Sequence, residues 1–299
     1  MKTTLLIAGV SLCGFLISLN KLPKSITTLS EMKKALKEGY AYIPSGKTCI
    51  GQDTVSCQGF FMMKGEVSNL NYKEYLSDLK KNGKQEAYLA ALPDSSRWNS
   101  NGYSLAKYVR YYSTHPAYNQ YPVVNLTREQ AEKYCEWLTG VWRKNTGNET
   151  IIFRLPTRTE FLRAANGSAL VRPYAWNSPY LRRSDGKFQC NFLSIDGGSI
   201  SRDPESGKFV VMSTPIDYLA QGADFADLTA PVYSFWPNEF GIYNLNGNVS
   251  EMLGEQNLAA GGDWNSPGYD IRNESVKNFT EAIPTVGFRA VMTFVEWNR

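Results

Sequence analysis

Histidine is nearly absent from this 299-residue sequence, in which it occurs once, as His115. A single imidazole disfavours a Ser/His/Asp triad and a metal centre built from several histidines. A phosphate-binding loop is missing as well, because the run Asp-Gly-Gly-Ser at residues 196–199 has no Lys-Ser/Thr after it. The net charge of +4 is spread along the chain and gives no indication of nucleic-acid binding.

The chain has one long apolar run, at residues 5–19, directly after a short basic start. This run is shorter than the roughly 20 apolar residues that a membrane-spanning helix needs. We therefore expect residues 1–20 to be a signal peptide or an N-terminal anchor, and the protein to be exported to the periplasm, the outer membrane or the cell surface. Lipidation of Cys13, which would attach the chain to a membrane, stays open because Leu12 stands where a small residue is usual.

Cysteine is scarce. Beyond Cys13 the sequence contains Cys49, Cys57, Cys135 and Cys190. In an oxidising compartment these four could form disulfides in three arrangements or remain buried thiols. Cys49 and Cys57 flank a short turn and are the easiest pair to bridge, whereas their spacing is too long for a paired zinc-ligand motif.

Helix and strand signals are spread over the remaining chain. The pattern predicts helices at residues 30–37 and 69–83 and short strands at 41–44, 47–51 and 59–63. Capping boxes at Thr127 and Thr157 predict two further helices. No regular pattern holds at residues 84–119, which we interpret as an aromatic-rich insertion. Without repeats or a linker, the simplest organisation is one domain over residues 25–299.

An Asn/Gly-rich stretch at residues 241–251 ends in the carboxylate of Glu251. Side-chain and carbonyl oxygens so close together suit a calcium ion. The same stretch also suits a plain Asn-Gly turn between strands, and the residues alone do not decide between the two.

The order of the short motifs along the chain supplies a further argument. The matching pieces are Glu66-Val-Ser-Asn69, Tyr121-Pro-Val-Val124, Phe153-Arg-Leu-Pro-Thr157, Tyr174-Ala-Trp176, Cys190-Asn191, Thr229-Ala-Pro-Val232, Pro237-Asn238, Gly241-Ile-Tyr-Asn244, Gly247-Asn-Val249, Glu251, Gly261-Gly262, Trp264 and Gly287-Phe-Arg289. In this order they resemble the formylglycine-generating enzyme family, the sulfatase-modifying-factor domain. The resemblance implies an α+β fold, the family's variant of the C-type lectin fold, with short strands and helices and much ordered loop.

The resemblance also implies two structural calcium sites. One would use the side chains of Asn244 and Glu251 and the backbone carbonyls of Gly247 and Val249. The other would use the side chains of Asn191 and Asp224 and the carbonyls of Phe192 and Ala226. Both ligand sets contain oxygen only, as calcium requires.

At the positions of the family's catalytic cysteines the sequence departs from the pattern. In catalytic members two cysteines after the Gly-Gly motif bind copper(I), whereas this sequence has Ser266 and Ile271. A hydroxyl is a poor ligand for this soft metal and an isoleucine side chain offers none. The family's sulfoxide-synthase branch needs several histidines. We therefore expect no copper, no catalytic residues and a protein that is not an enzyme.

The stretch from His115 to Val124 narrows the expected function. It resembles a segment of the gliding-motility and type IX secretion lipoproteins of Bacteroidota. We expect an exported scaffold or binding protein that joins envelope proteins in a homo- or hetero-oligomeric assembly. One alternative is a C-type-lectin-like module binding glycans or peptides through the loop around Trp264 to Tyr269 and the insertion. Another is an enzyme of unrecognised chemistry at Asp263, Ser266, Asp270 or Arg272.

Overall fold

The computed structural model describes residues 28–99, 105–194, 200–203, 205–207, 209–211 and 228–294. The expected leader at residues 1–20 with Cys13, the turn at 196–199, and the predicted calcium ligands Asp224 and Ala226 lie outside these ranges.

Five of the six α-helices in the described ranges begin where local hydrogen bonding or packing favours them. They are α2 (Leu29–Leu36), α3 (Asn69–Lys81), α5 (Ala106–Tyr111), α6 (Arg128–Thr146) and α7 (Arg158–Asn166). The capping boxes predicted at Thr127 and Thr157 are confirmed. The helix predicted to begin at Asn69 is capped by the residue before it, because the Ser68 hydroxyl accepts from the Asn71 N–H while the Asn71 side chain accepts from the Ser68 N–H.

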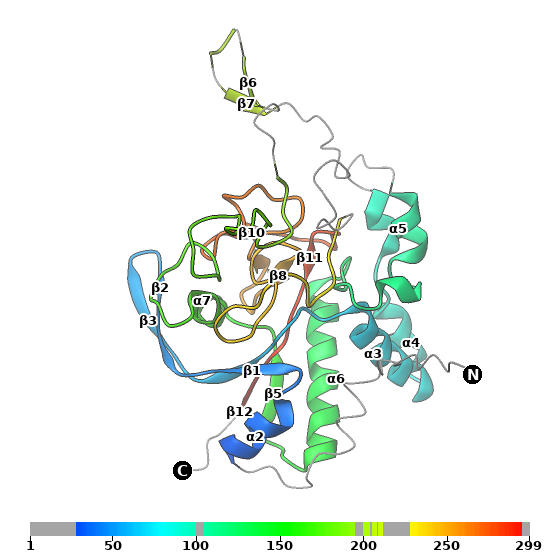
Figure 1. The fold of residues 1–299 in the computed structure, drawn as a ribbon. Coiled ribbons are helices and arrows are strands. Elements are labelled where there is room, and N and C mark those ends of the chain that lie inside the picture. Colours follow the sequence, from blue (N-terminus) through cyan, green and yellow to red (C-terminus); the bar gives the residue numbers. More distant parts are fainter. Residues whose placement is uncertain are drawn as a thin grey trace, which may run out of the picture.

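The first sheet has four strands in the order β1-β4-β12-β5, all antiparallel to their neighbours. These strands are β1 (Tyr40–Ile43), β4 (Phe60–Met63), β12 (Val291–Phe294) and β5 (Ile151–Arg154). Strand β12, near the C-terminal end of the described residues, therefore pairs with β4 from the N-terminal part of the chain and with β5 from its middle. Helix α6 lies beside β5 of this sheet (Figure 1). Buried side chains of α6, including Tyr134, Leu138 and Trp142, share one core with the sheet.

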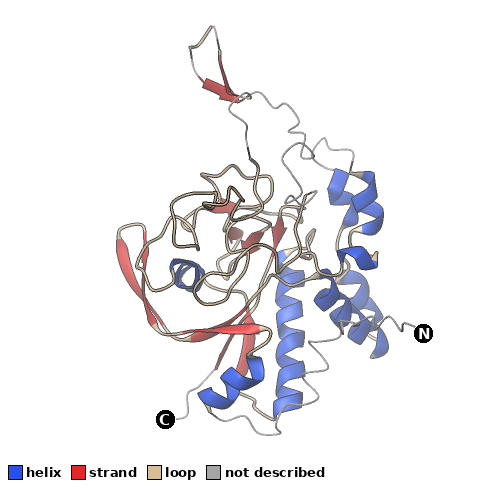
Figure 2. Cartoon of the chain, viewed as in Figure 1, coloured by secondary structure: helices blue, strands red, loops and turns tan. Residues whose placement is uncertain are grey.

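The second sheet is small and lies within long loops, which Figure 2 shows in tan. Its order is β10-β9-β8-β11, with β10 (Val276–Asn278), β9 (Leu258–Ala260), β8 (Ser250–Met252) and β11 (Val286–Gly287). Two hairpins complete the strands, β2 (Gly46–Ile50) with β3 (Asp53–Cys57), and β6 (Ile200–Arg202) with β7 (Phe209–Val211). Together these elements confirm the predicted α+β class.

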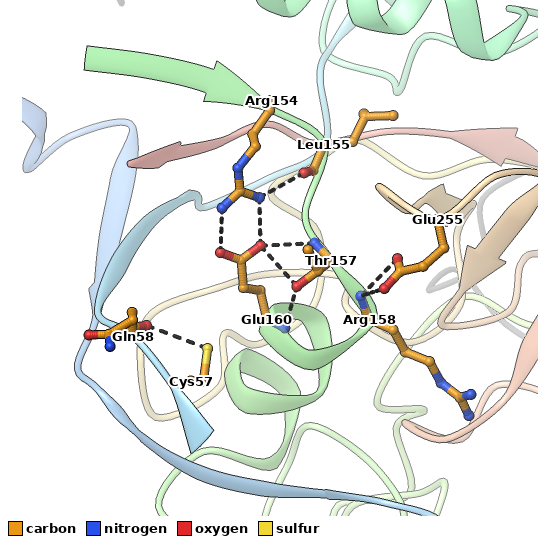
Figure 3. A network of polar contacts seen from close by, with 8 residues as sticks. All are labelled: Cys57, Gln58, Arg154, Leu155, Thr157, Arg158, Glu160 and Glu255. Atoms are coloured by element: carbon orange, nitrogen blue, oxygen red, sulfur yellow. Dashed lines mark hydrogen bonds and ion pairs between the residues drawn. The ribbon is translucent and has the colours of Figure 1, made fainter. Parts of the chain in front are cut away.

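The N-terminus of α7 is held by a network of charged groups that Figure 3 shows. Arg154, at the end of β5, donates to both carboxylate oxygens of Glu160 at 2.7 Å. Glu160 also accepts from the Thr157 N–H at 2.8 Å, and Glu255 accepts from the Arg158 N–H at 2.9 Å. The network therefore ties β5, α7 and the β8–β9 connection together next to the second sheet.

The segment at residues 84–119 is more regular than the sequence predicts. It forms α4 (Gln85–Ala90), α5 and the 3-10 helices η1 (Ser95–Asn99) and η2 (Pro116–Tyr118). Neither α4 nor α5 has a side-chain cap, so the sequence carried no start signal for them. They are stabilised by packing: α4 lies against α3 with Tyr88 on the main core, and α5 belongs to a buried cluster of Trp98, Tyr108, Tyr112 and Trp264.

The four described cysteines are free thiols. In the β2–β3 hairpin Cys49 pairs with Thr54 and Cys57 pairs with Gly46, so the two cysteines are not cross-strand neighbours. Cys135 and Cys190 belong to different core clusters. Neither the Cys49–Cys57 disulfide nor the complementary Cys135–Cys190 disulfide is therefore formed.

Within the described ranges, the helices are too short or too polar to cross a membrane.

Candidate functional site: a buried polar network around the Asn-Gly turn

The Asn-Gly turn predicted from the sequence connects the loop before β8 to the second sheet. Asn244, Gly247 and Asn248 have left-handed backbone angles, with φ of 54°, 74° and 62°. Asparagine and glycine tolerate this region better than other residues. At Gly247 a Cβ would lie only 2.2 Å from the backbone oxygen of Asn191, so a side chain has no room. The turn is thus packed directly against the segment that carries Asn191 and Phe192.

Glu251 on β8 forms a buried ion pair with Arg289. The Arg289 guanidinium donates to both carboxylate oxygens, with Nε 2.6 Å from Oε2, and both side chains are essentially unexposed. Arg289 also donates to the carbonyls of Met63 and Tyr243 at 3.1 and 2.8 Å. Burial raises the pKa of Glu251, and the charge and hydrogen bonds of Arg289 oppose the rise. The pair therefore fastens β8 to the end of β4 and to the turn.

A second carboxylate, Glu66, lies in the same network. Glu66 accepts from the side-chain amides of Asn248 at 2.8 Å and Asn244 at 3.2 Å. Glu66 is 1% exposed, and this burial raises its pKa to about 8. The nearby charge of Glu251 adds to the rise in pKa, whereas Arg289 and the hydrogen bond from Asn248 oppose it. Glu66 and Glu251 therefore belong to one buried network, in which Arg289 pairs with Glu251 and the two asparagine amides bind Glu66.

The calcium ligands predicted from the sequence are partly brought together. Asn244, Gly247, Val249 and Glu251 lie on the turn and the start of β8, and Asn191 contacts them because its amide donates to Asn248 Oδ1 at 3.4 Å. Phe192 is buried beside them in its own aromatic cluster. Asp224 and Ala226, which would complete the other site, fall outside the described residues.

The donor set of the turn fits a hard cation. Asn244 Oδ1 is buried without a hydrogen-bond partner, and the carboxyl groups of Glu66 and Glu251 lie in the same network. Each oxygen of Glu251 retains a lone pair beyond the one that Arg289 uses. Across the described ranges there is no cluster of three or more His, Cys, Asp or Glu side chains, so asparagine and backbone oxygens would have to complete the coordination.

The positions of the family's copper ligands do not fit copper(I). Ser266 Oγ accepts from the Asp263 N–H at 3.2 Å, and Ile271 is completely buried in an aromatic cluster. Asp263 accepts from the Ser250 hydroxyl at 2.9 Å and from Lys277 at 2.6 Å. These groups form a polar hydrogen-bond network around Asp263 in place of the thiolate pair that would bind copper(I).

Exposed aromatic and arginine side chains surround this region. Tyr180, Trp236 and Tyr269 are 72%, 41% and 69% exposed. Arg183 lies over the Trp236 ring and Arg272 over the Tyr269 ring, at 4.0 and 3.6 Å from the ring centroids. We call these five side chains the aromatic–arginine surface.

Ring stacking and side-chain-to-backbone hydrogen bonds connect the loops that carry the aromatic–arginine surface. Trp176 stacks on Tyr174 at 4.7 Å and donates to the Tyr180 carbonyl at 2.9 Å. The Tyr174 hydroxyl donates to the carbonyl of Gly268, next to Tyr269, at 3.0 Å. Trp176 and Trp236 line the same small hollow. The surface is therefore held by a fixed framework.

Other aromatic residues expected to contact a ligand are buried. Trp98, Tyr108 and Tyr112 of the insertion and Trp264 of the Gly-Gly-Asp-Trp motif are at most 4% exposed. The prediction that they supply sugar contacts is wrong, because they form an internal cluster. Tyr269 is the member of the expected contact loop that remains exposed.

Two residues of the network were given no role from the sequence. Glu66 and Arg289 stood in the motifs Glu-Val-Ser-Asn and Gly-Phe-Arg, 223 positions apart, which is too far for any local spacing rule to pair them. One feature of the sequence could have indicated that they are paired: each is the charged residue of a motif that is otherwise uncharged. His115, the other residue of interest, caps η2 by accepting from the Ala117 N–H at 3.2 Å.

Residues 27–294 match the model of the sulfatase-modifying factor enzyme 1-like domain. The chain is similar to the formylglycine-generating enzymes of Streptomyces coelicolor, at 29% identity over 52% of this chain and 36% of that one, and of Thermomonospora curvata, at 30% over 49% and 36%. The enzyme of Mus musculus is 26% identical over 56% of this chain and 33% of its own. The matched stretch thus spans about a third of these relatives.

Solved structures agree on the fold. Treponema denticola variable protein 1 has a TM-score of 0.51 at 15% identity, covering 84% of this chain and 94% of its own. The crystal structure of CarF has a TM-score of 0.50 at 16% identity, covering 85% and 97%. The fold expected from the motifs, the formylglycine-generating-enzyme variant of the C-type lectin fold, is confirmed.

The expectation that the chain is not an enzyme is contradicted. It rested on Ser266 and Ile271, but the three relatives are all formylglycine-generating enzymes. Ser266 and Ile271 do not provide thiolate ligands for copper(I). The chain nevertheless belongs to an enzyme family.

Proposed function

The chain belongs to the sulfatase-modifying factor enzyme 1-like domain family, and on that basis we propose that it is an exported protein that binds partner proteins in a cell-envelope assembly. The assembly class we propose is gliding motility or type IX secretion. The apolar N-terminus and the stretch from His115 to Val124 support export and this class.

The observation that carries the binding proposal is the aromatic–arginine surface. Trp, Tyr and Arg are the residue types that dominate the energetics of protein–protein contacts. Here Tyr180, Trp236 and Tyr269 are exposed, while Tyr174 below them is buried and Trp176 is half-buried. A surface with its side chains already positioned loses little conformational entropy on binding. A protein partner therefore suits this surface.

We also propose that calcium stiffens the loops below this surface. Asn244 and Glu251, with the carbonyls of Gly247 and Val249, would hold one ion, and Asn191 with Phe192, Asp224 and Ala226 a second. The unpartnered oxygen of Asn244 supports the first of these sites. Bound calcium supplies charge neutralisation and cross-links loops that have little regular hydrogen bonding.

Affinity purification from native membranes tests the proposed function. The tagged full-length chain, extracted with mild detergent, is expected to carry envelope proteins with it at stoichiometric levels. Recovery of a clean monomer contradicts the proposal. A glycan array in calcium separates the sugar-binding alternative, which predicts specific hits where a protein-binding surface predicts none.

A second candidate is an enzyme of this family that works through the polar network around Asp263. The similarity to three formylglycine-generating enzymes favours this second candidate. The contacts of buried Asp263 with Lys277 and Ser250 favour it as well. Metal analysis of the purified protein is the direct test. Stoichiometric copper or iron supports this candidate, and calcium as the sole bound metal counts against a redox reaction.

A further inference from the structure

Glu66 connects both asparagines of the Asn-Gly turn. Its Oε1 accepts from Asn248 Nδ2 at 2.8 Å and its Oε2 from Asn244 Nδ2 at 3.2 Å. The three side chains are 8% exposed or less. One carboxylate thus holds the two ends of a five-residue turn whose backbone is left-handed at both asparagines.

The neighbours of Asn244 fix which way its amide points. Its Nδ2 donates to Glu66 and to the Pro231 carbonyl at 3.3 Å, and both of these groups are acceptors only. Rotating the amide by 180° would place its oxygen against two acceptors, which is electrostatically unfavourable. Asn244 Oδ1 must therefore face the other way, where it is buried without a partner.

A buried acceptor without a partner has an unfavourable free energy, of about 1–3 kcal/mol. A cation that arrives at Asn244 Oδ1 would give this buried oxygen the partner it lacks.

We infer that Glu66 is a positioning residue for the calcium ion proposed above: by taking both amide donors, it presents Asn244 Oδ1 as a ligand. The inference rests on the proposed calcium site and adds a residue that is not itself among its ligands. Asn248 extends the effect toward Asn191, whose carbonyl accepts from the Asn248 N–H at 2.7 Å. Glu66 thereby holds the turn in register with the segment of the second proposed site.

The test is calcium binding by the full-length protein with Glu66→Gln. Glutamine offers one acceptor and one donor, so it cannot accept from both asparagines, and the Asn244 amide loses its fixed orientation. We expect the calcium Kd from titration calorimetry to weaken roughly 10–100-fold, as for other groups that orient metal ligands. The melting temperature without calcium should change little, because glutamine keeps the volume of the side chain and can still accept from one of the two amides. Magnesium in place of calcium should give no comparable binding in either protein.

The matched control is Glu160→Gln, which removes a carboxylate paired with Arg154 outside the turn. It should lower the melting temperature without calcium but leave the calcium Kd within twofold. If Glu66→Gln does not fold, Glu66→Asp carries the test, since its shorter side chain cannot reach both amides and should also weaken binding.

The outcomes separate the inference from the proposal beneath it. A wild-type Kd in Glu66→Gln or Glu66→Asp overturns the role of Glu66 and leaves the calcium site standing. A wild-type protein that neither binds calcium nor melts at higher temperature in its presence overturns both.

Discussion

At the scale of single residues, Arg289 makes the most connections in the described network. It donates to Glu251 and to backbone carbonyls of two segments that are far apart in sequence. Buried pairs of this kind add little net stability when complete, but the loss of one partner leaves a buried charge uncompensated. The planar guanidinium fits this role because it donates in several fixed directions at once.

Arg289→Lys should therefore be strongly destabilising although the charge is kept. A lysine ammonium cannot make the two-pronged contact with Glu251 and also reach the carbonyls. We expect a loss of about 2–4 kcal/mol in the free energy of unfolding, measured by chemical denaturation. Arg154→Lys, at a pair whose arginine is 38% exposed, is the control and should lose about 1 kcal/mol or less. Equal losses in both variants would contradict the importance of burial.

Gly247 tests the close approach of the turn to Asn191. Gly247→Ala must strain a positive φ and also displace a carbonyl oxygen 2.2 Å from the new Cβ. Gly83→Ala has a similar φ of 69° but open space around the Cβ. We expect Gly83→Ala to lose about 1–2 kcal/mol and Gly247→Ala to lose clearly more or to yield no folded protein. Similar thermal unfolding of the two variants would show that the turn is not tightly packed.

At the scale of elements, α3 and α6 leave a cavity of about 410 Å³ between them. Its lining is mixed in charge: Lys73, Glu74, Ser77, Asp78, Lys81, Trp137, Val141, Lys144 and Asn145. Trp137 donates to Asp78 at 2.9 Å across this cavity. Burial raises the pKa of Glu74, on α3, to about 7.

Glu74 should make the stability of the fold depend on pH. A carboxyl whose pKa is about 7 when folded, against 4.5 ordinarily, binds more protons in the folded state between these values. The folded protein should therefore lose stability as the pH rises from about 5 to 8. Glu74→Gln should lessen this loss and raise the melting temperature at pH 8 by on the order of 2 °C. The same change at the exposed Glu38 is the control, and an unaltered pH profile in Glu74→Gln would refute the expectation.

The sequence predicted those elements whose signal lies within a few neighbouring residues and missed those that depend on contacts between distant residues. The helices at Thr127 and Thr157 were predicted because a capping box is complete within four residues. Helices α4 and α5 were missed because neither has a side-chain cap and both depend on tertiary packing, α4 against α3 and α5 around Trp98. The turn around Gly247 was located correctly, but its partners Glu66 and Arg289 were not paired, since only the folded chain brings them together.

At the scale of the whole molecule, the chain keeps the family's framework while two of its positions have changed chemistry. The family model covers residues 27–294, so the framework is nearly complete. Ser266 and Ile271 stand where the motif pattern expects thiolates, and both are held by local packing or hydrogen bonds. Above this region lies the aromatic–arginine surface, which is where we propose that a partner binds.

The most direct test of the binding proposal compares the wild type with the double variant Trp236→Ser/Tyr269→Ser in affinity purification from native membranes. Both side chains are exposed, so the variant should fold and melt like the wild type. We predict that the wild type recovers a defined set of envelope proteins and that the double variant loses most of them, at least tenfold by quantitative mass spectrometry. Recovery of the same proteins by both, or of none by the wild type, would contradict the account.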